Sequence, residues 1–263
     1  MNEVFNPGRF FKYLKYDLTS ARSNYGLSLL IIGLIPLWAY IIYEIISLIS
    51  GNGWSDANTG LQYSAAGTAI VMLLLTAPVK LYGSLTEKRS GSSWLLIPAS
   101  PFEKFLSMLL VTCVAVPVLG LGLMVCSDAL LSLIFPGYCE PMVKDFSAIL
   151  DFHGNAPFTF HPVLLWINWC ENILFFTLGA ICFKKAKIGK TFLCLMGLGI
   201  IITSLIALFA QSPNISTDWL LERFGQDEAA MQRGINLTIN AIYFVVFVLL
   251  DLGIYFRIKT MKH

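Results

Sequence analysis

The sequence has few charged residues, and this shortage excludes an ordinary water-soluble protein. Only 13% of its 263 residues are Asp, Glu, Lys or Arg, whereas 56% are hydrophobic. A soluble domain carries about 25% charged residues. With a mean hydropathy of +0.70, the chain has too little polar surface to face water on all sides, so we expect lipid to cover much of it. The net charge of +2 is too small to indicate nucleic-acid binding.

The sequence also lacks the motifs of common catalytic and metal sites. It contains no His-Glu-x-x-His pattern and no Gly-x-Ser-x-Gly elbow, and its three histidines have no ligand spacing. Gly189-Lys190-Thr191 resembles the end of a P-loop, but Lys184 stands where that motif needs a glycine. Five of the six cysteines fall in or beside apolar runs, where Cys behaves as a small hydrophobe. We therefore predict no catalytic residue, no metal site and no cofactor on this chain.

Long apolar runs, in contrast, are abundant. A helix needs about 20 residues to cross a bilayer. Six stretches are long and apolar enough: 27–49, 63–82, 105–130, 163–183, 191–210 and 235–256. In the third stretch, Pro117, Gly120 and Gly122 are expected to kink the helix. The predicted fold class is an all-α integral membrane protein with about six transmembrane helices.

The distribution of Lys and Arg predicts how these helices are oriented. Basic residues accumulate in the cytoplasmic connections of membrane proteins. Of the 18 Lys and Arg residues, only Lys144, Arg223 and Arg233 fall outside the two terminal segments and the second and fourth connections with their flanks. This partition alternates at every crossing, so both termini are predicted to be cytoplasmic. We expect an N-terminal segment, residues 1–26, followed by a six-helix domain, residues 27–263.

The residue pattern of the N-terminal segment predicts an amphipathic helix that lies in the membrane interface. Its first 24 residues are polar and aromatic, so we expect them to be retained rather than cleaved as a signal peptide. Lys15 and Arg22 flank an apolar stripe, where they suit anionic headgroups. The alternative is a solvated basic tail. The stripe consists of Phe10, Phe11, Leu14, Leu18 and Ala21.

The second connection, residues 83–104, contains a clear helix-start signal. Ser100 stands at the N-cap, Pro101 at the first helical position and Glu103 at the third. This is the pattern of a capping box, in which the Ser and Glu side chains satisfy backbone N–H groups that the helix leaves unpaired. We predict that the third transmembrane helix starts here, just inside the cytoplasmic interface.

Ionisable residues within the apolar stretches are candidates for function, because charge is costly in a bilayer. Glu171 lies deepest, near the middle of the fourth stretch, and Asn168 and Asn172 are expected to share a polar stripe with it. Asp251 lies about a turn and a half from the cytoplasmic end of the sixth. Such residues serve either as a hydrogen-bonded joint between helices or as part of a substrate or proton path.

The layout and one local stretch resemble the membrane subunits of ABC-2-type ABC transporters, the permease halves of exporters. The stretch from Leu95 to Phe105, Leu-Leu-Ile-Pro-Ala-Ser-Pro-Phe-Glu-Lys-Phe, is similar to a Leu-Pro-Ala-Ser-x-x-Glu-Lys-Phe pattern in a bacterial subgroup, with Ile97 in place of Leu. The family layout also has an interfacial N-terminal helix, six crossings, a cytoplasmic connection between the second and third, and a partly helical outer segment before the sixth.

The resemblance implies a subunit of the bacterial cytoplasmic (inner) membrane that forms a translocation pathway with a second copy or a homologous permease. A separate cytosolic ABC ATPase would hold ATP and Mg²⁺ and dock on a coupling helix within residues 84–98. The residues expected to contact it are Glu87, Lys88, Arg89 and Trp94. The alternative is that Ser100–Phe105 marks a helix start and nothing more.

Composition and topology also fit two other classes of membrane protein. One is a self-contained proton-coupled secondary transporter, in which Glu171 or Asp251 carries the proton. The other is a non-transporting sensor or assembly protein.

Overall fold

The structure is a computed structural model that describes residues 5–51, 59–135, 162–210 and 228–261. Its regular elements are helices, and no strand occurs in these four ranges. The helices are α1 (Pro7–Gly33), α2 (Ile35–Ile49), α3 (Thr59–Tyr82), η1 (Gly83–Thr86), α4 (Lys88–Leu96), α5 (Pro101–Leu110), η2 (Val111–Ala115), α6 (Val116–Ile134), α8 (Pro162–Cys182), α9 (Lys187–Ala210) and α11 (Glu228–Thr260).

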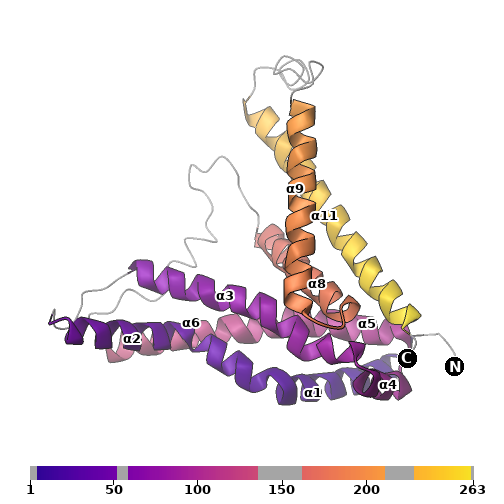
Figure 1. Cartoon of the computed structure of the whole chain (residues 1–263), viewed down its shortest axis with the longest axis horizontal. Helices are drawn as coiled ribbons and strands as arrows, with labels where there is room; N and C mark the ends of the chain where they lie inside the picture. Colours follow the sequence, from indigo (N-terminus) through magenta and orange to yellow (C-terminus); the bar gives the residue numbers. More distant parts are fainter. Residues whose placement is uncertain (1–4, 52–58, 136–161, 211–227, 262–263) are drawn as a thin grey trace.

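The helices form two arms that diverge from a common base (Figure 1). One arm contains α2, α3 and α6, and the other contains α9 and α11, with α8 at their junction. The base holds α4, the first part of α1, the start of α5 and the C-terminal end of α11. Four aromatic side chains tie these pieces together. Phe5 lies 5.9 Å from Phe102 of α5, and Tyr255 of α11 lies 5.9 Å from Phe105, measured between ring centroids.

The first helix is longer than the predicted interfacial helix, because it continues into the first apolar stretch as far as Gly33. There the chain bends by 42° before α2 begins. Pro36 lies in the first turn of α2 and has no N–H to continue the hydrogen bonding of α1. The boundary between the two helices thus lies at Leu34 rather than near Gly26.

A single rod joins the base to the first arm. Residues Pro101–Ile134 form one continuous helical segment in which a π-helical turn, η2, separates α5 from α6. Pro117 is the second residue of α6, just after this turn. Proline cannot donate to the preceding turn, and a π-turn is one way of accommodating the lost hydrogen bond. The irregularity expected from Pro117 is therefore present, displaced by one turn toward the N-terminus.

Four helical segments in the described residues are long and apolar enough to cross a membrane: Gly60–Thr86, Pro101–Ile134, Lys187–Ser204 and Asn240–Thr260. The bent pair α1–α2 would make a fifth. The described part of the protein is therefore α-helical, with four or five such helices. The predictions of six crossings and of two cytoplasmic termini stay predictions, and the expected outer helical segment before the sixth crossing lies outside the described residues.

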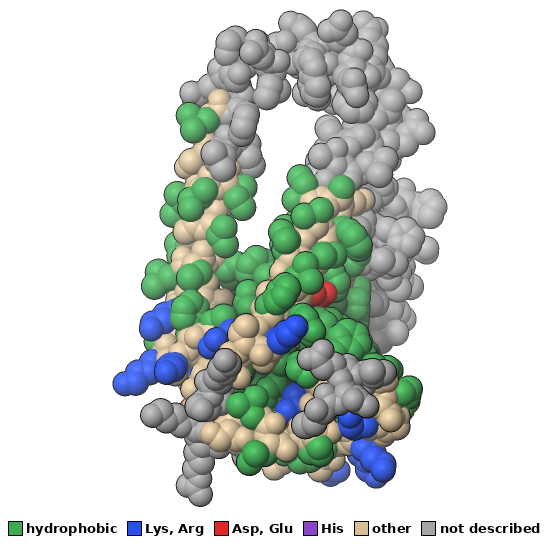
Figure 2. All heavy atoms as spheres, turned by 90° about the vertical axis from the view of Figure 1, so that its right-hand side faces the viewer, with side chains coloured by type: hydrophobic (Ala, Val, Ile, Leu, Met, Phe, Trp, Pro, Cys, Tyr) green, Lys and Arg blue, Asp and Glu red, His purple; other side chains and the backbone are tan. Residues whose placement is uncertain are grey.

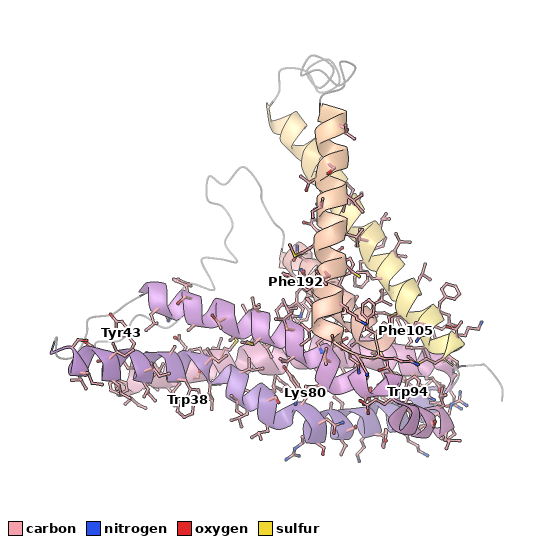
Figure 3. All side chains as sticks on the ribbon, in the orientation of Figure 1. Trp38, Tyr43, Lys80, Trp94, Phe105 and Phe192 are labelled. Atoms are coloured by element: carbon pink, nitrogen blue, oxygen red, sulfur yellow. The ribbon has the colours of Figure 1, made fainter. Side chains whose placement is uncertain are left out.

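The surface of the described part fits a membrane environment. In Figure 2, Lys and Arg side chains lie in the lower part of the molecule, at the base, and hydrophobic side chains cover the α9 and α11 arm above them. Trp38 of α2 and Phe192 of α9 stand out from the ribbon in Figure 3 and are 51% and 53% exposed. Large apolar side chains in this position suit contact with lipid. This positive charge marks the end of the molecule that the sequence assigns to the cytoplasm.

Candidate functional site: a polar joint at the basic end

Helix α4 lies between α3 and α5 at the basic end, within residues 84–98, where the resemblance implies a coupling helix. It begins after Glu87, whose backbone is extended, and ends at Ile97, which is extended as well. Serine and glycine fill the middle of α4 and make it a poor helix by propensity. Contacts with α1 and α5 are therefore needed to hold it.

The capping box is present at the start of α5. Ser100 Oγ accepts a hydrogen bond of 3.2 Å from the backbone N–H of Glu103, and Glu103 Oε2 accepts one of 2.9 Å from the N–H of Ser100. Pro101 occupies the first helical position. Glu103 Oε2 thereby accepts a bond from the start of its own helix, and both side-chain oxygens also accept bonds from a partner.

That partner is Arg9 of α1. Its guanidinium donates through Nε to Glu103 Oε2 at 2.8 Å and through Nη2 to Oε1 at 2.8 Å, and the backbone N–H of Asn6 donates to Oε1 at 3.0 Å. The carboxylate is completely buried, while the side chain of Arg9 remains 32% exposed. Burial by itself raises the pKa of Glu103, but the hydrogen bonds from Arg9, Asn6 and Ser100 outweigh it and lower the pKa to about 2. Glu103 is thus ionised and tied to both α1 and α5.

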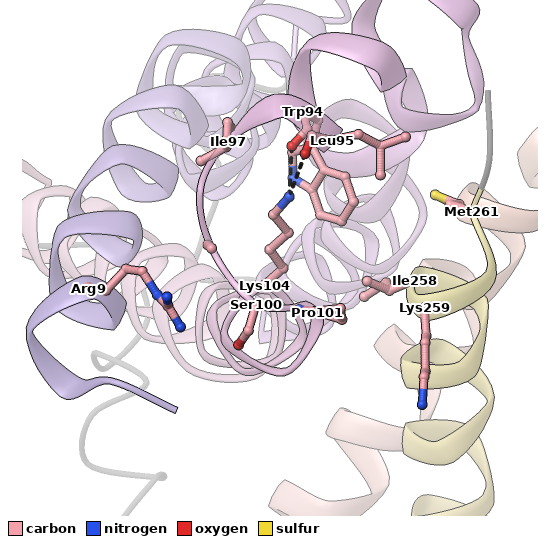
Figure 4. Close-up of a pocket in the computed structure, with 11 residues that line it drawn as sticks. Arg9, Trp94, Leu95, Ile97, Ser100, Pro101, Lys104, Ile258, Lys259 and Met261 are labelled. Carbon is pink, nitrogen blue, oxygen red and sulfur yellow. Dashed lines mark hydrogen bonds between the residues drawn. The ribbon is translucent and has the colours of Figure 1, made fainter. Parts of the chain in front are cut away.

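Trp94 and Lys104 connect α4 to the same two helices. The indole N–H of Trp94 donates to the hydroxyl of Tyr13 on α1 at 3.0 Å. Lys104 Nζ donates to the carbonyl oxygens of Trp94 and Leu95 at 2.9 Å and 3.4 Å and lies 4.5 Å from the centre of the indole ring (Figure 4). These carbonyls are at the C-terminal end of α4, where a cation is favoured by the helix dipole. Burial lowers the pKa of Lys104.

A third group of polar side chains lies one turn further into the helices. Asp17 of α1 accepts hydrogen bonds from Tyr82 of α3 at 3.0 Å and from Ser107 of α5 at 2.6 Å. Burial raises the pKa of Asp17, although the bonds from Ser107 and Tyr82 act in the opposite direction. Asp17 is therefore the point at which α1, α3 and α5 meet. We call these three groups of contacts, centred on Glu103, on Trp94 and Lys104, and on Asp17, the polar joint.

The residues expected to contact a partner on α4 differ in their placement. Glu87 is exposed, and Lys88 and Arg89 open the helix, although their side chains lie outside the described part. Trp94 points inward and is 8% exposed, because it packs against Tyr13 and Lys104. The most exposed apolar side chain of α4 is Leu96, at 84%, compared with 36% for Leu95. As the helix stands, Trp94 holds α4 in place and Leu96 is available to a partner.

The acids within the apolar stretches lie elsewhere, where α8 packs on α11. Glu171 is buried, whereas Asn168 and Asn172 are exposed and bond to each other, with 2.9 Å between Asn172 Nδ2 and Asn168 Oδ1. The expected stripe is thus divided, because the amides face outward and the acid faces inward. Glu171 Oε1 and Asp251 Oδ1 are buried and have no hydrogen-bond partner among the described residues.

Sequence reasoning missed most members of the polar joint. They are Asn6, Arg9, Tyr13, Asp17, Tyr82, Lys104 and Ser107. Arg9 and Lys104 counted only as cytoplasmic charge, and the apolar stripe drew attention to the outer face of α1. A signal did exist, since Tyr13 and Asp17 are four residues apart and share a helix face. That face turns inward together with Phe10 of the predicted apolar stripe, which is 5% exposed, whereas Phe11 of the same stripe is 65% exposed.

In the described ranges, no group of three or more His, Cys, Asp or Glu side chains is arranged to hold a metal ion. Comparison with known proteins found no matching family model, no matching curated protein and no matching solved structure. The polar joint and the two acids with an unbonded buried oxygen, Glu171 and Asp251, are therefore the features on which a function can be argued.

Proposed function

We propose that this chain is the permease subunit of an ATP-driven exporter of the ABC-2 type in the bacterial cytoplasmic membrane. It would form the translocation pathway with a second copy or a homologous chain. Its ATPase would be a separate cytosolic subunit that carries ATP and Mg²⁺. The support comes from the Leu95–Phe105 stretch, from several apolar helices and from a short helix, α4, at the end of the molecule where basic residues gather.

One observation carries the proposal: α4 is bonded both to α1 and to the rod Pro101–Ile134. A motor that pushes on α4 can move the membrane helices only if α4 does not slide over them. Trp94 fixes α4 to α1 through Tyr13, and Lys104 fixes its C-terminal end to the rod. Because the rod continues from α5 into α6, a displacement of α4 reaches deep into the apolar part of the molecule.

Co-purification tests this proposal. The tagged chain is isolated in mild detergent, and the proteins that accompany it are identified by mass spectrometry. We expect an ABC ATPase, and we expect its recovery to fall when Glu87, Lys88 and Arg89 are replaced together by Ala or when Leu96 is replaced by Asp. The matched control replaces Lys184 and Lys185, two exposed lysines of another basic connection, by Ala.

The control variant should retain the ATPase. If the well-folded chain purifies without any ATPase, or if the α4 variants and the control retain it equally, the proposed coupling through α4 is wrong. ATP hydrolysis by the isolated chain at an appreciable rate would also contradict the proposal, since the chemistry is assigned to the partner.

The acids Glu171 and Asp251 favour a second candidate, a self-contained proton-coupled transporter. A buried carboxyl oxygen without a hydrogen-bond partner is costly when ionised, so Glu171 and Asp251 suit reversible protonation. Reconstitution in liposomes without an ATPase separates the two functions. Uptake driven by a pH gradient, and abolished by Glu171→Gln, would support this candidate, whereas an unchanged rate in Glu171→Gln would remove Glu171 from the mechanism.

A further inference from the structure

A cavity of about 290 Å³ opens at the base between the end of α4, the start of α5 and the C-terminal end of α11 (Figure 4). Ligand pockets commonly have volumes of about 300–1,000 Å³. This cavity is therefore large enough for a small polar group but too small to enclose a whole lipid or peptide. Its walls come from three helices that the polar joint and the aromatic contacts hold together.

Positive charge dominates the polar part of this cavity. Its charged lining residues are Arg9, Lys104 and Lys259. Arg9 is balanced by Glu103, but Lys104 has no carboxylate within ion-pair distance among the described residues. Lys104 is nevertheless only 5% exposed. Buried charges in proteins are normally paired, and the two carbonyl oxygens that Lys104 contacts are dipoles and not a counter-charge.

The remainder of the lining is largely apolar. Leu95 and Ile97 contribute from the α4 side, and Ile258 and Met261 from the end of α11. The helices behind this lining, α5 and α11, both belong to segments that are apolar and long enough to cross a membrane. The cavity thus lies where the basic end meets the apolar helices, at the level that phospholipid headgroups occupy in a membrane protein oriented by its basic residues.

We propose that this cavity binds the phosphate of an anionic phospholipid, with the acyl chains lying along the apolar surface of α5 and α11. In Figure 4 the ammonium group of Lys104 points to the end of α4 and the side chain of Lys259 extends away from it. Lys259 is exposed and turns toward the cavity to bind the phosphate, while Lys104 contributes its charge from the cavity wall. The phosphate supplies the counter-charge that Lys104 lacks. Basic pockets between membrane helices on the cytoplasmic side commonly receive such headgroups. This inference does not depend on an ATPase partner, so it can fail or hold independently of the exporter proposal.

Lipid titration of the purified, delipidated chain in mild detergent tests the site, with bound lipid counted by native mass spectrometry. The probes are phosphatidylglycerol and phosphatidylcholine with the same acyl chains, and glycerol 3-phosphate as a soluble phosphate. We expect phosphatidylglycerol to bind more tightly than either of the others. Each lysine near a lipid surface contributes about 1 kcal/mol, so Lys259→Met should weaken phosphatidylglycerol binding about fivefold.

Two further variants make the test decisive. Lys12→Met removes an exposed lysine of α1 outside the cavity lining and should bind as the unchanged chain does. Lys104→Met should weaken binding at least as much as Lys259→Met, but it also removes the cap of α4. Lys259→Met leaves that cap in place, so this variant decides the outcome. Lys259→Arg keeps the positive charge and should bind phosphatidylglycerol as the unchanged chain does.

Equal binding of phosphatidylglycerol and phosphatidylcholine would overturn the inference. So would equal losses in Lys259→Met and Lys12→Met, because the attraction would then be a general property of the basic end. Binding of glycerol 3-phosphate as tight as that of phosphatidylglycerol would show that the cavity serves a soluble anion and not a lipid.

Discussion

Replacing Glu103 by Gln should destabilise the protein by about 3 kcal/mol. The side-chain oxygens of Glu103 accept hydrogen bonds from Arg9, Asn6 and Ser100. An amide of the same shape keeps one acceptor oxygen but turns an NH₂ group toward donors. Losing a hydrogen bond to a charged group costs about 1.5–3 kcal/mol, and removing one partner of a buried ion pair costs about 3–5 kcal/mol. Arg9 is 32% exposed and regains some hydration, which favours the lower part of that range.

Thermal unfolding in detergent, followed by tryptophan fluorescence, measures this loss. In a chain of this size, 1 kcal/mol corresponds to about 2–4 °C, so we expect Tm to fall by roughly 6–12 °C. Glu87→Gln is the matched control, because Glu87 belongs to the same connection and is exposed. A surface change of that kind should stay within about 0.5 kcal/mol. Equal Tm values for the two variants would refute the role assigned to Glu103.

The same pair predicts a dependence on pH with a definite sign. The pKa of Glu103 is lowered from 4.5 in the unfolded chain to about 2 in the folded protein. Its contribution is therefore complete above pH 4.5 and is lost as pH falls toward 2. Because Glu103→Gln cannot titrate, the difference in Tm between the unchanged chain and this variant should be smaller at about pH 3.5 than at pH 7. A difference that widens on acidification would contradict the ion pair.

Two smaller predictions concern other contacts of the base and the arms. Tyr13→Phe leaves the buried indole N–H of Trp94 without its acceptor, so it should lower the free energy of unfolding by about 1–3 kcal/mol. The loss is measured as a lower Tm, and an unchanged Tm would mean that the indole N–H has another acceptor. Gly179→Ala would drive its Cβ into the side chain of Thr191 where α8 packs on α9, and overpacking of this kind costs about 1–3 kcal/mol. Gly197→Ala, which meets nothing within 4 Å, is the control and should be neutral or stabilising.

The sequence predicted those features that depend on neighbouring residues. Apolar runs identified α3, α8 and α9 to within a few residues, because a membrane helix is recognised from its own composition and length. The capping box of α5 was likewise visible in the sequence, since Ser100 and Glu103 are three residues apart and act within one turn. Local physics of this kind needs no knowledge of the tertiary structure.

Contacts between distant segments could not be predicted in the same way. Arg9 and Glu103 are separated by 94 positions, and no spacing rule relates them. Trp94 illustrates the consequence. The family resemblance implied that it contacts a partner, but its indole N–H bonds to Tyr13 of another helix. Leu96 is the side chain of α4 that is most exposed to a partner. Nothing in the sequence distinguishes it from its neighbour Leu95.

The polar joint holds α1 and α5 together with polar rather than apolar side chains, and this choice has a physical consequence. A buried ion pair can often be replaced by packed apolar residues with no loss of stability, so stability alone does not explain Glu103. A directional bond has a different consequence: Glu103 can satisfy Arg9, Asn6 and Ser100 together only in one orientation of α1 relative to α5. An apolar contact would let these helices slide. The chain is proposed to receive force at α4, and a polar joint transmits rotation and displacement between the helices better than an apolar contact that slides. Lys104 extends this joint to α4 through its bond to the carbonyl oxygen of Trp94.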